Sequence, residues 1–218
     1  MTPSPEAIAT ALNDHIKVDG FNLPGRSNHI QAATLLPLRW RDGLSVIATV
    51  RSSKLRQHAG EVCFPGGTPD NEHETLRETA IREAEEELGI VAPTILGRLS
   101  KMPVYTSAHR ITPWVGAISE TRLVPAAGEV SKVLDIPIRP LLQRTTLEGL
   151  PFPMPDGIRW SPVFHMDGHI IYGATAHTLL ELLEVLAPLY GTRCPPLAKG
   201  STEWADILPP KWAAGLPG

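Results

Sequence analysis

The segment REAEEELG, residues 82–89, places four glutamates in five positions directly before a glycine. Upstream, Thr75 and Glu78 have the spacing of a capping box, so we expect a helix that begins at about Leu76. Gly89 is a typical residue for the end of such a helix. One buried stripe follows from apolar residues that recur every four positions: Leu76, Ala80, Ala84 and Leu88.

The charges of this helix are unusual. Acidic side chains near a helix C-terminus oppose its dipole, and Glu83 and Glu87 repel each other by roughly 0.2–0.5 kcal/mol. Glu83, Glu86 and Glu87 share one flank of the helix. Their oxygens suit Mg²⁺, Mn²⁺ or Ca²⁺, and the preceding PGGTPD turn lets main-chain groups approach a metal or phosphate. The pattern favours metal-assisted hydrolysis of a phosphoanhydride, with a solvated acidic face as the alternative.

Length and composition fit one globular domain. The chain has 218 residues, of which 42% are hydrophobic and 20% charged. A formal charge of −3 gives no general affinity for polyanions, so we expect no nucleic-acid partner. We also expect no membrane segment, because no apolar run approaches the roughly 18 residues required. Cys63 and Cys194 are far apart and no signal peptide is visible, which we interpret as a cytoplasmic protein with reduced thiols.

The rest of the chain alternates strands with helices. A short helix is expected over about residues 4–15, started by Ser4 and Pro5. Strands are expected over residues 32–38, 44–51 and 60–67, in ILGRLS, TPWVGAI and VSKVLDIPI, and in a hairpin over 163–171. A leucine-rich helix from Thr175 to about Tyr190 and a Pro-rich tail, residues 192–218, complete the chain. This order predicts an α/β or α+β fold.

The segment from Gly66 to Ile90 resembles the signature of the Nudix hydrolases. That signature runs glycine, a spacer, glutamate, a second spacer, then Arg-Glu-apolar-any-Glu-Glu-any-Gly-apolar, and the second half is complete from Arg82 onward. The first half departs, since Glu72, His73 and Glu74 all lie near the position of the first glutamate. The resemblance implies an α/β/α sandwich with a mixed β-sheet between helices.

The longer spacer and an upstream pattern resemble the coenzyme A pyrophosphatases within this family. The upstream pattern is Arg51-Ser52, Arg56, Gly60 and Phe64-Pro65-Gly66-Gly67, each part separated by three residues. Downstream, TPWVGAI, GEVSKVLDIPI and IYGATAHTLLELL also resemble that subfamily. The resemblance covers about residues 30–190. We therefore expect a single Nudix domain over residues 1–218, with the N-terminal helix and the tail outside the resemblance.

The resemblance implies roles for the helix residues. Glu83 and Glu87 would bind Mg²⁺ or Mn²⁺, with Glu86 close by as a ligand or orienting acid. The carbonyl of Gly67 would be a main-chain ligand. Arg82 would hold the glutamates by charge-assisted hydrogen bonds; the alternative for Arg82 is a surface ion pair of little energetic weight.

Further candidates lie outside the helix. Glu129 stands where Nudix enzymes often place another glutamate, so it is a candidate metal ligand or general base, with an exposed loop residue as the alternative. Coenzyme A carries a diphosphate and a 3′-phosphate, so several cations are expected near it. The candidate substrate contacts are Arg51, Lys54, Arg56, Gly66 and Gly67. The alternative is that the run of cations Arg51, Lys54, Arg56 and His58 is only a solvated loop.

The expected reaction is hydrolysis of the diphosphate of coenzyme A or acyl-coenzyme A to 3′,5′-ADP and 4′-phosphopantetheine or its acyl form. Two alternatives stay open. One is the same chemistry on ADP-ribose or another nucleoside diphosphate derivative, and the other is a non-catalytic nucleotide-binding module on the same scaffold. Many members of this class are dimers, which adds a homodimer to the expectations.

Overall fold

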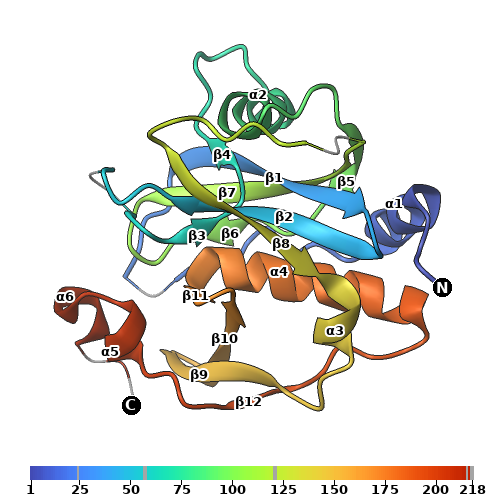
Figure 1. Ribbon diagram of the computed structural model, residues 1–218. Coiled ribbons are helices and arrows are strands. Elements are labelled where there is room, and N and C mark those ends of the chain that lie inside the picture. Colours follow the sequence, from blue (N-terminus) through green and yellow to red (C-terminus); the bar gives the residue numbers. More distant parts are fainter. Residues whose placement is uncertain (24, 56–57, 120–121, 215, 217–218) are drawn as a thin grey trace.

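The computed structural model describes residues 1–23, 25–55, 58–119, 122–214 and 216. Its central layer is a mixed sheet (Figure 1). The main path of the sheet is β3 (Val62–Cys63), β2 (Leu44–Arg51), β1 (Ile30–Trp40), β7 (His109–Ala117) and β5 (Thr94–Arg98). Beside this path, β4 (Gly66–Gly67) pairs with β1, β6 (Met102–Pro103) pairs with β7, and β8 (Val130–Pro137) pairs with β2. β1 and β7 run parallel, while β1 and β2 form the expected antiparallel hairpin.

Two helices cover opposite faces of this sheet (Figure 1). α2 (Leu76–Leu88) packs its alanine and leucine stripe on one face, against buried Ala33, Leu35 and Ile47. α4 (Gly173–Leu186) packs on the other face within the larger core cluster and continues as a 3₁₀ turn, Ala187–Tyr190. The predicted sandwich of helices around a mixed sheet is therefore confirmed.

Shorter helices occupy the margins. α1 (Pro5–Asp14) begins at the predicted N-cap, where the Ser4 hydroxyl accepts the N–H of Ala7, and it buries Ile8 and Leu12. The other short helices are α3 (Ile138–Leu142), α5 (Trp204–Ile207) and α6 (Pro210–Ala213). Within the described ranges, no helix is both long and apolar enough to traverse a bilayer.

A second, four-stranded sheet lies beyond α4 (Figure 1). Its order is β11 (His169–Ile171), β10 (Gly157–Met166), β9 (Leu147–Met154) and β12 (Leu197–Lys199). The turn between β10 and β11 is the predicted hairpin. The sequence did not indicate β9 or the start of β10, because prolines at positions 151, 153, 155 and 162 weaken any strand pattern there.

The C-terminal tail contributes to this second sheet. β12 pairs in parallel with β9, and the indole N–H of Trp204 donates to the carbonyl of Pro151 at 2.8 Å. Trp204 is buried together with Ile207 and Leu208. The expected strand over 60–67 differs in detail, since Phe64 and Pro65 separate β3 from β4.

Candidate active site

Helix α2 is held at both ends as its sequence predicts. The Thr75 hydroxyl accepts the N–H of Glu78 at 3.3 Å, and the Glu78 carboxylate accepts the N–H of Thr75 at 2.8 Å. Gly89 ends the helix in the left-handed region, with a φ of 69°. Because the caps and the apolar stripe fix the rotation of α2, its acidic flank faces the β4 turn.

Glu87 is the deepest carboxylate of this flank. Its residue is only 5% exposed, and the N–H of Gly66 donates to its Oε1 at 3.3 Å. Burial raises the pKa of the Glu87 carboxyl to about 7. The Gly66 hydrogen bond and the charge of Arg51 oppose this rise, while the charges of Glu83 and Glu129 add to it. Without a further cation, the ionised form of Glu87 is destabilised by its burial.

Glu83 lies against the main chain of Gly67. A Cβ added at Gly67 would fall less than 3.0 Å from the Glu83 carboxylate, so only glycine leaves room for this approach. Burial raises the pKa of Glu83, and the guanidinium of Arg82 opposes that rise. Gly66 is also required by shape, because its added Cβ would collide with the Ala33 carbonyl on β1. Both glycines therefore bring main-chain atoms close to the acidic flank.

Arg82 joins four groups around the site. Its Nε donates to Glu74 at 2.8 Å, and its Nη1 donates to Glu83 at 3.0 Å and to Glu86 at 3.1 Å. Its Nη2 donates to the carbonyl of Thr68 at 3.1 Å. These hydrogen bonds raise the pKa of the Arg82 guanidinium further above its ordinary value. One guanidinium thus contacts three carboxylates and a main-chain carbonyl, which is more than a single surface ion pair.

The hydrogen bonds of Arg82 distinguish Glu74 from Glu72 and His73, the three residues near the position of the first glutamate of the motif. The Glu74 side chain is 12% exposed, bonds to Arg82, and accepts the N–H of Asp70 at 2.6 Å. Glu72 and His73 are each 87% exposed and contact each other. Arg82 holds the pKa of Glu74 below its ordinary value. Glu74 is therefore the glutamate that the fold brings to Arg82.

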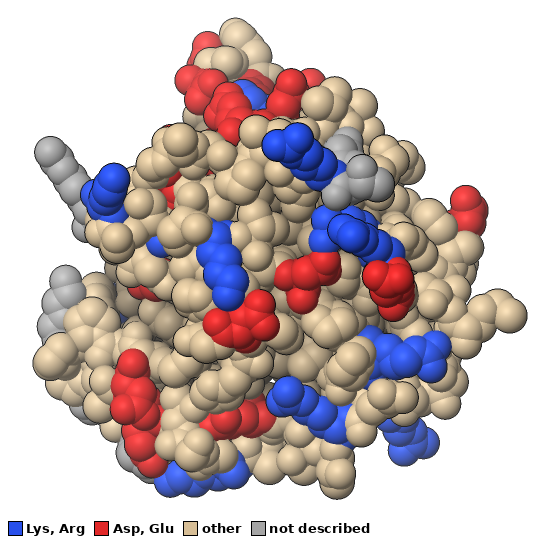
Figure 2. Space-filling model, viewed as in Figure 1, with Lys and Arg blue, Asp and Glu red and all other residues tan. Residues whose placement is uncertain are grey.

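The outer acidic residues differ from this inner group. Glu86 is 58% exposed and touches the site through Arg82, while Glu85 is exposed on another side of α2. Glu129 is exposed, but its main-chain carbonyl accepts the N–H of Ser52 at 2.7 Å, and its charge raises the pKa of Glu87. Acidic side chains consequently gather over α2 (Figure 2).

The predicted substrate cations separate in a similar way. Arg51 lines the cavity next to the site and is partly buried; no acceptor among the described residues bonds to its buried Nε. Lys54 is exposed and does not line that cavity. Arg56 lies outside the described residues. Of these cations, the structure thus brings Arg51 to the acidic flank.

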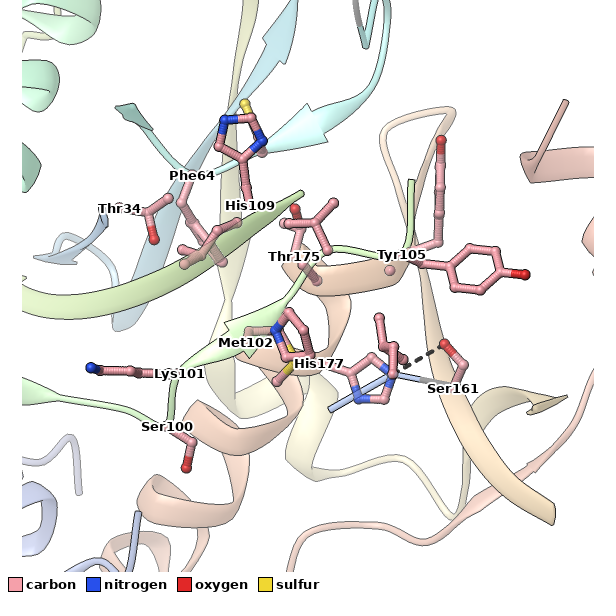
Figure 3. Close-up of a pocket in the computed structure, with 18 of the residues that line it drawn as sticks. Thr34, Phe64, Ser100, Lys101, Met102, Tyr105, His109, Ser161, Thr175 and His177 are labelled. Carbon is pink, nitrogen blue, oxygen red and sulfur yellow. Dashed lines mark hydrogen bonds between the residues drawn. The ribbon is translucent and has the colours of Figure 1, made fainter. Parts of the chain in front are cut away.

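A cavity of about 730 Å³ opens beside the site. Its wall includes Arg51, Gly66 and Gly67 at one end, and it continues to α4 and the second sheet. Figure 3 shows Thr34 from β1, Phe64 from the link between β3 and β4, Tyr105 and His109 from the β6–β7 region, and His177 from α4 around the same space. The volume lies within the roughly 300–1,000 Å³ of small-molecule sites.

Comparison with known proteins places the site in a family. The family model of the NUDIX domain matches residues 29–137, which include the glycine turn and all of α2. The chain is 37% identical over 137 residues to a protein of Pectobacterium atrosepticum named "Uncharacterized Nudix hydrolase NudL", covering 60% of this chain and 71% of that one. The chain belongs to the Nudix hydrolase family.

Other Nudix relatives differ in length from this chain. It is 43% identical over 122 residues to Nudix hydrolase 3 of Caenorhabditis elegans, covering 53% of this chain and 50% of that protein. For that relative and for the NudL protein of Yersinia enterocolitica, the chain spans about half of the relative's length, 50% and 58%. A MutT/nudix family protein from Enterococcus faecalis shares the fold, with a TM-score of 0.55 at 15% identity over 77% of this chain and 66% of that one.

The Nudix acidic flank has the donor set of a divalent cation site. Within the described residues, no three His, Cys, Asp or Glu side chains already form a ligand cluster. Glu83, Glu87 and the carbonyl of Gly67 offer two carboxylates and one main-chain oxygen instead. Mg²⁺ takes one or two carboxylates and completes its shell with water and substrate oxygens. Since burial raises the pKa of both carboxylates, a cation between them would relieve an existing cost, and these residues fit the metal.

The sequence marked the acidic side of this Nudix site and missed its far wall. Ser161, His177 and Trp204 line the cavity, yet they lie in β10, α4 and α5. The one signal in the sequence was His177, a polar residue in a leucine-rich helix. Its hydrogen-bond partner Ser161 lies in the second sheet, and the sequence did not predict that strand because the segment is rich in proline.

Proposed function

We propose that the protein hydrolyses the diphosphate bond of coenzyme A or acyl-coenzyme A, using Mg²⁺ or Mn²⁺, to 3′,5′-ADP and 4′-phosphopantetheine or its acyl form. The observation that carries this proposal is Arg51, a half-buried cation whose Nε has no acceptor among the described residues and which lines the same cavity as Gly66 and Gly67. A cytoplasmic location and a homodimer remain further predictions.

The chain's own residues would divide the work. Glu83, Glu87 and the carbonyl of Gly67 would hold the metal, which when bound neutralises diphosphate charge and acidifies water. Arg82 would keep Glu83 and Glu86 in place through its hydrogen bonds. Glu129, near enough to influence Glu87, is the candidate general base toward water.

We favour coenzyme A as the substrate because of its charge distribution. It carries a 3′-phosphate in addition to the diphosphate, and Arg51 offers a directional donor for such an anion. The upstream pattern from Arg51 to Gly67, which resembles the coenzyme A pyrophosphatases, supports the same choice. The non-catalytic alternative rested on the displaced first glutamate; the bonding of Glu74 to Arg82 supports the catalytic proposal instead.

The direct test is product identification. The protein is incubated separately with coenzyme A, ADP-ribose and deoxynucleoside triphosphates in Mg²⁺ or Mn²⁺, and the products are identified by mass spectrometry. Release of 3′,5′-ADP and phosphopantetheine, faster than the other substrates react, supports the proposal. Cleavage of ADP-ribose alone would keep the chemistry and reject the substrate. Binding of coenzyme A without turnover of any substrate would favour the non-catalytic module.

Arg51→Ala tests the substrate assignment. We expect it to reduce kcat/KM for coenzyme A more than for dephospho-coenzyme A, which lacks the 3′-phosphate. Lys54→Ala is the matched control, because Lys54 is exposed and lies off the cavity wall. Equal losses for both substrates in Arg51→Ala would argue against recognition of the 3′-phosphate.

A further inference from the structure

The cavity extends away from the glycine turn into a space between α4 and the second sheet. We call this space the deep chamber; its wall comprises Met102, Phe152, Ser161, His177, Trp204 and Leu208. These residues come from β6, β9, β10, α4 and the tail segment around α5. The C-terminal tail therefore supplies part of the chamber wall.

Most of the deep chamber is apolar and held in place. The Phe152 ring meets those of Tyr105 and Trp204 edge to face, with centroids 5.4 and 5.9 Å apart. Trp204 is 6% exposed and is fixed by its hydrogen bond to Pro151. An aliphatic or other uncharged group gains from burial against such a wall, whereas a phosphate would lose its hydration there.

The polar groups of the deep chamber are neutral. His177 Nε2 and Ser161 Oγ lie 3.2 Å apart in a hydrogen bond (Figure 3). Burial lowers the pKa of the His177 imidazole to about 4, so the ring carries no charge near neutral pH. A neutral imidazole and a hydroxyl each offer donor and acceptor capacity. This pair suits an amide or hydroxyl group of a ligand.

The charged side chains elsewhere on the cavity wall indicate which part of a substrate each end of the cavity favours. The cation Arg51 lies at the glycine-turn end, where the neighbouring carboxylate Glu61 is paired with His58 at 2.9 Å. The buried carboxylate Glu181 and the exposed carboxylate Glu184 line another part of the cavity. Lys101 also lines the cavity, but Figure 3 shows its side chain pointing away from the His177–Ser161 pair. Arg159 is exposed and bonded to Asp156 at 2.8 Å. A phosphorylated nucleoside is thus favoured near Arg51 and an uncharged group in the deep chamber.

We infer that the deep chamber binds the uncharged, amide-bearing arm on one side of the scissile diphosphate, with the His177–Ser161 pair hydrogen-bonding its amide or hydroxyl groups and Trp204 forming its apolar wall. The inference rests on the proposed function, since the pantetheine arm of coenzyme A is such a group. The C-terminal tail then selects substrates as well as stabilising the second sheet.

Binding of the two separate products tests this inference by isothermal titration calorimetry. His177→Phe keeps a ring of similar size and removes the hydrogen bonds, and Ser161→Ala removes the partner hydroxyl. We expect each to weaken binding of 4′-phosphopantetheine roughly tenfold, the loss from a hydrogen bond left unmade, and to leave 3′,5′-ADP within about twofold. His29→Phe is the matched control, because His29 is exposed and outside the cavity wall.

The opposite pattern, weaker 3′,5′-ADP with unchanged phosphopantetheine, would put the nucleoside in the chamber and overturn the inference. Equal losses for both products would overturn it as well. Thermal unfolding of each variant shows that the binding data come from folded protein, and Ser161→Ala provides a milder change if His177→Phe unfolds. Since binding is measured without turnover, absence of coenzyme A hydrolysis would defeat the proposed function while leaving a phosphopantetheine-specific effect intact.

Discussion

Replacing Glu87 by glutamine removes the most buried charge of α2 and keeps an oxygen that can accept the Gly66 N–H. In the metal-free protein, the pKa of Glu87 is raised from its ordinary 4.5 to about 7 by burial. A carboxyl whose pKa is raised by folding contributes stability at pH values below its pKa in the unfolded state. This stability is lost as the pH rises through its pKa in the folded state. At about 1.4 kcal/mol per pKa unit, the charged Glu87 costs about 3 kcal/mol of unfolding free energy at pH 8.

Glu87→Gln should therefore be more stable than the wild type at pH 8 in the absence of metal. Urea unfolding in EDTA at pH 8 should show Glu87→Gln ahead by up to about 3 kcal/mol, and at pH 5 the two proteins should nearly coincide. Excess Mg²⁺ at pH 8 should stabilise the wild type by mass action and narrow the gap. If Glu87→Gln is no more stable than the wild type at pH 8 without metal, the carboxylate is not the costly anion inferred here.

The same variant should lose most turnover of whichever substrate the protein hydrolyses, since it removes one of the two proposed carboxylate ligands. Glu83→Gln should behave alike in activity assays, with circular dichroism confirming that the fold survives. Glu85→Gln is the matched control, because Glu85 lies on the same helix and is exposed. Near-full activity in both Glu83→Gln and Glu87→Gln would reject the site.

Gly67→Ala should lower kcat/KM by about 100-fold with little change in melting temperature, because the added Cβ displaces the adjoining carboxylate. Glu74→Gln should lower activity roughly 10–100-fold through Arg82, whereas Glu72→Gln, at a residue 87% exposed, should behave as the wild type; similar activities in steady-state assays would contradict the assignment of Glu74. Trp204→Ala should reduce the unfolding free energy by about 3–5 kcal/mol, measured by urea denaturation, and a loss below 1 kcal/mol would show that the tail is not anchored there.

Local sequence patterns account for much of the acidic side of the site. The capping box, the four-residue apolar spacing and Gly89 each act within a few residues, so α2 and the orientation of Glu83 and Glu87 could be predicted. The β1–β2 hairpin has the same local origin. Such features depend on backbone geometry and side-chain periodicity, which are readable without knowing what packs on top.

Other parts depend on contacts between distant segments. Glu72 and Glu74 are equivalent in the sequence, and only the fold of the loop brings Glu74 to Arg82. Arg51 and Lys54 are neighbours with equal charge, yet one faces the cavity and the other faces solvent. Burial of Glu87 likewise comes from the β4 turn above it, and this burial produces its raised pKa.

By itself, the sequence determined the acidic helix, its glycine turn and the family to which they belong, because these signals are short and local. Only the tertiary structure decided what lies opposite them. Ser161, His177 and Trp204 come from three elements, and a proline-rich segment with little strand pattern becomes a sheet when α4 and the tail cover it. A chamber is formed by the surfaces of several elements at once, and its shape and polarity therefore follow from packing.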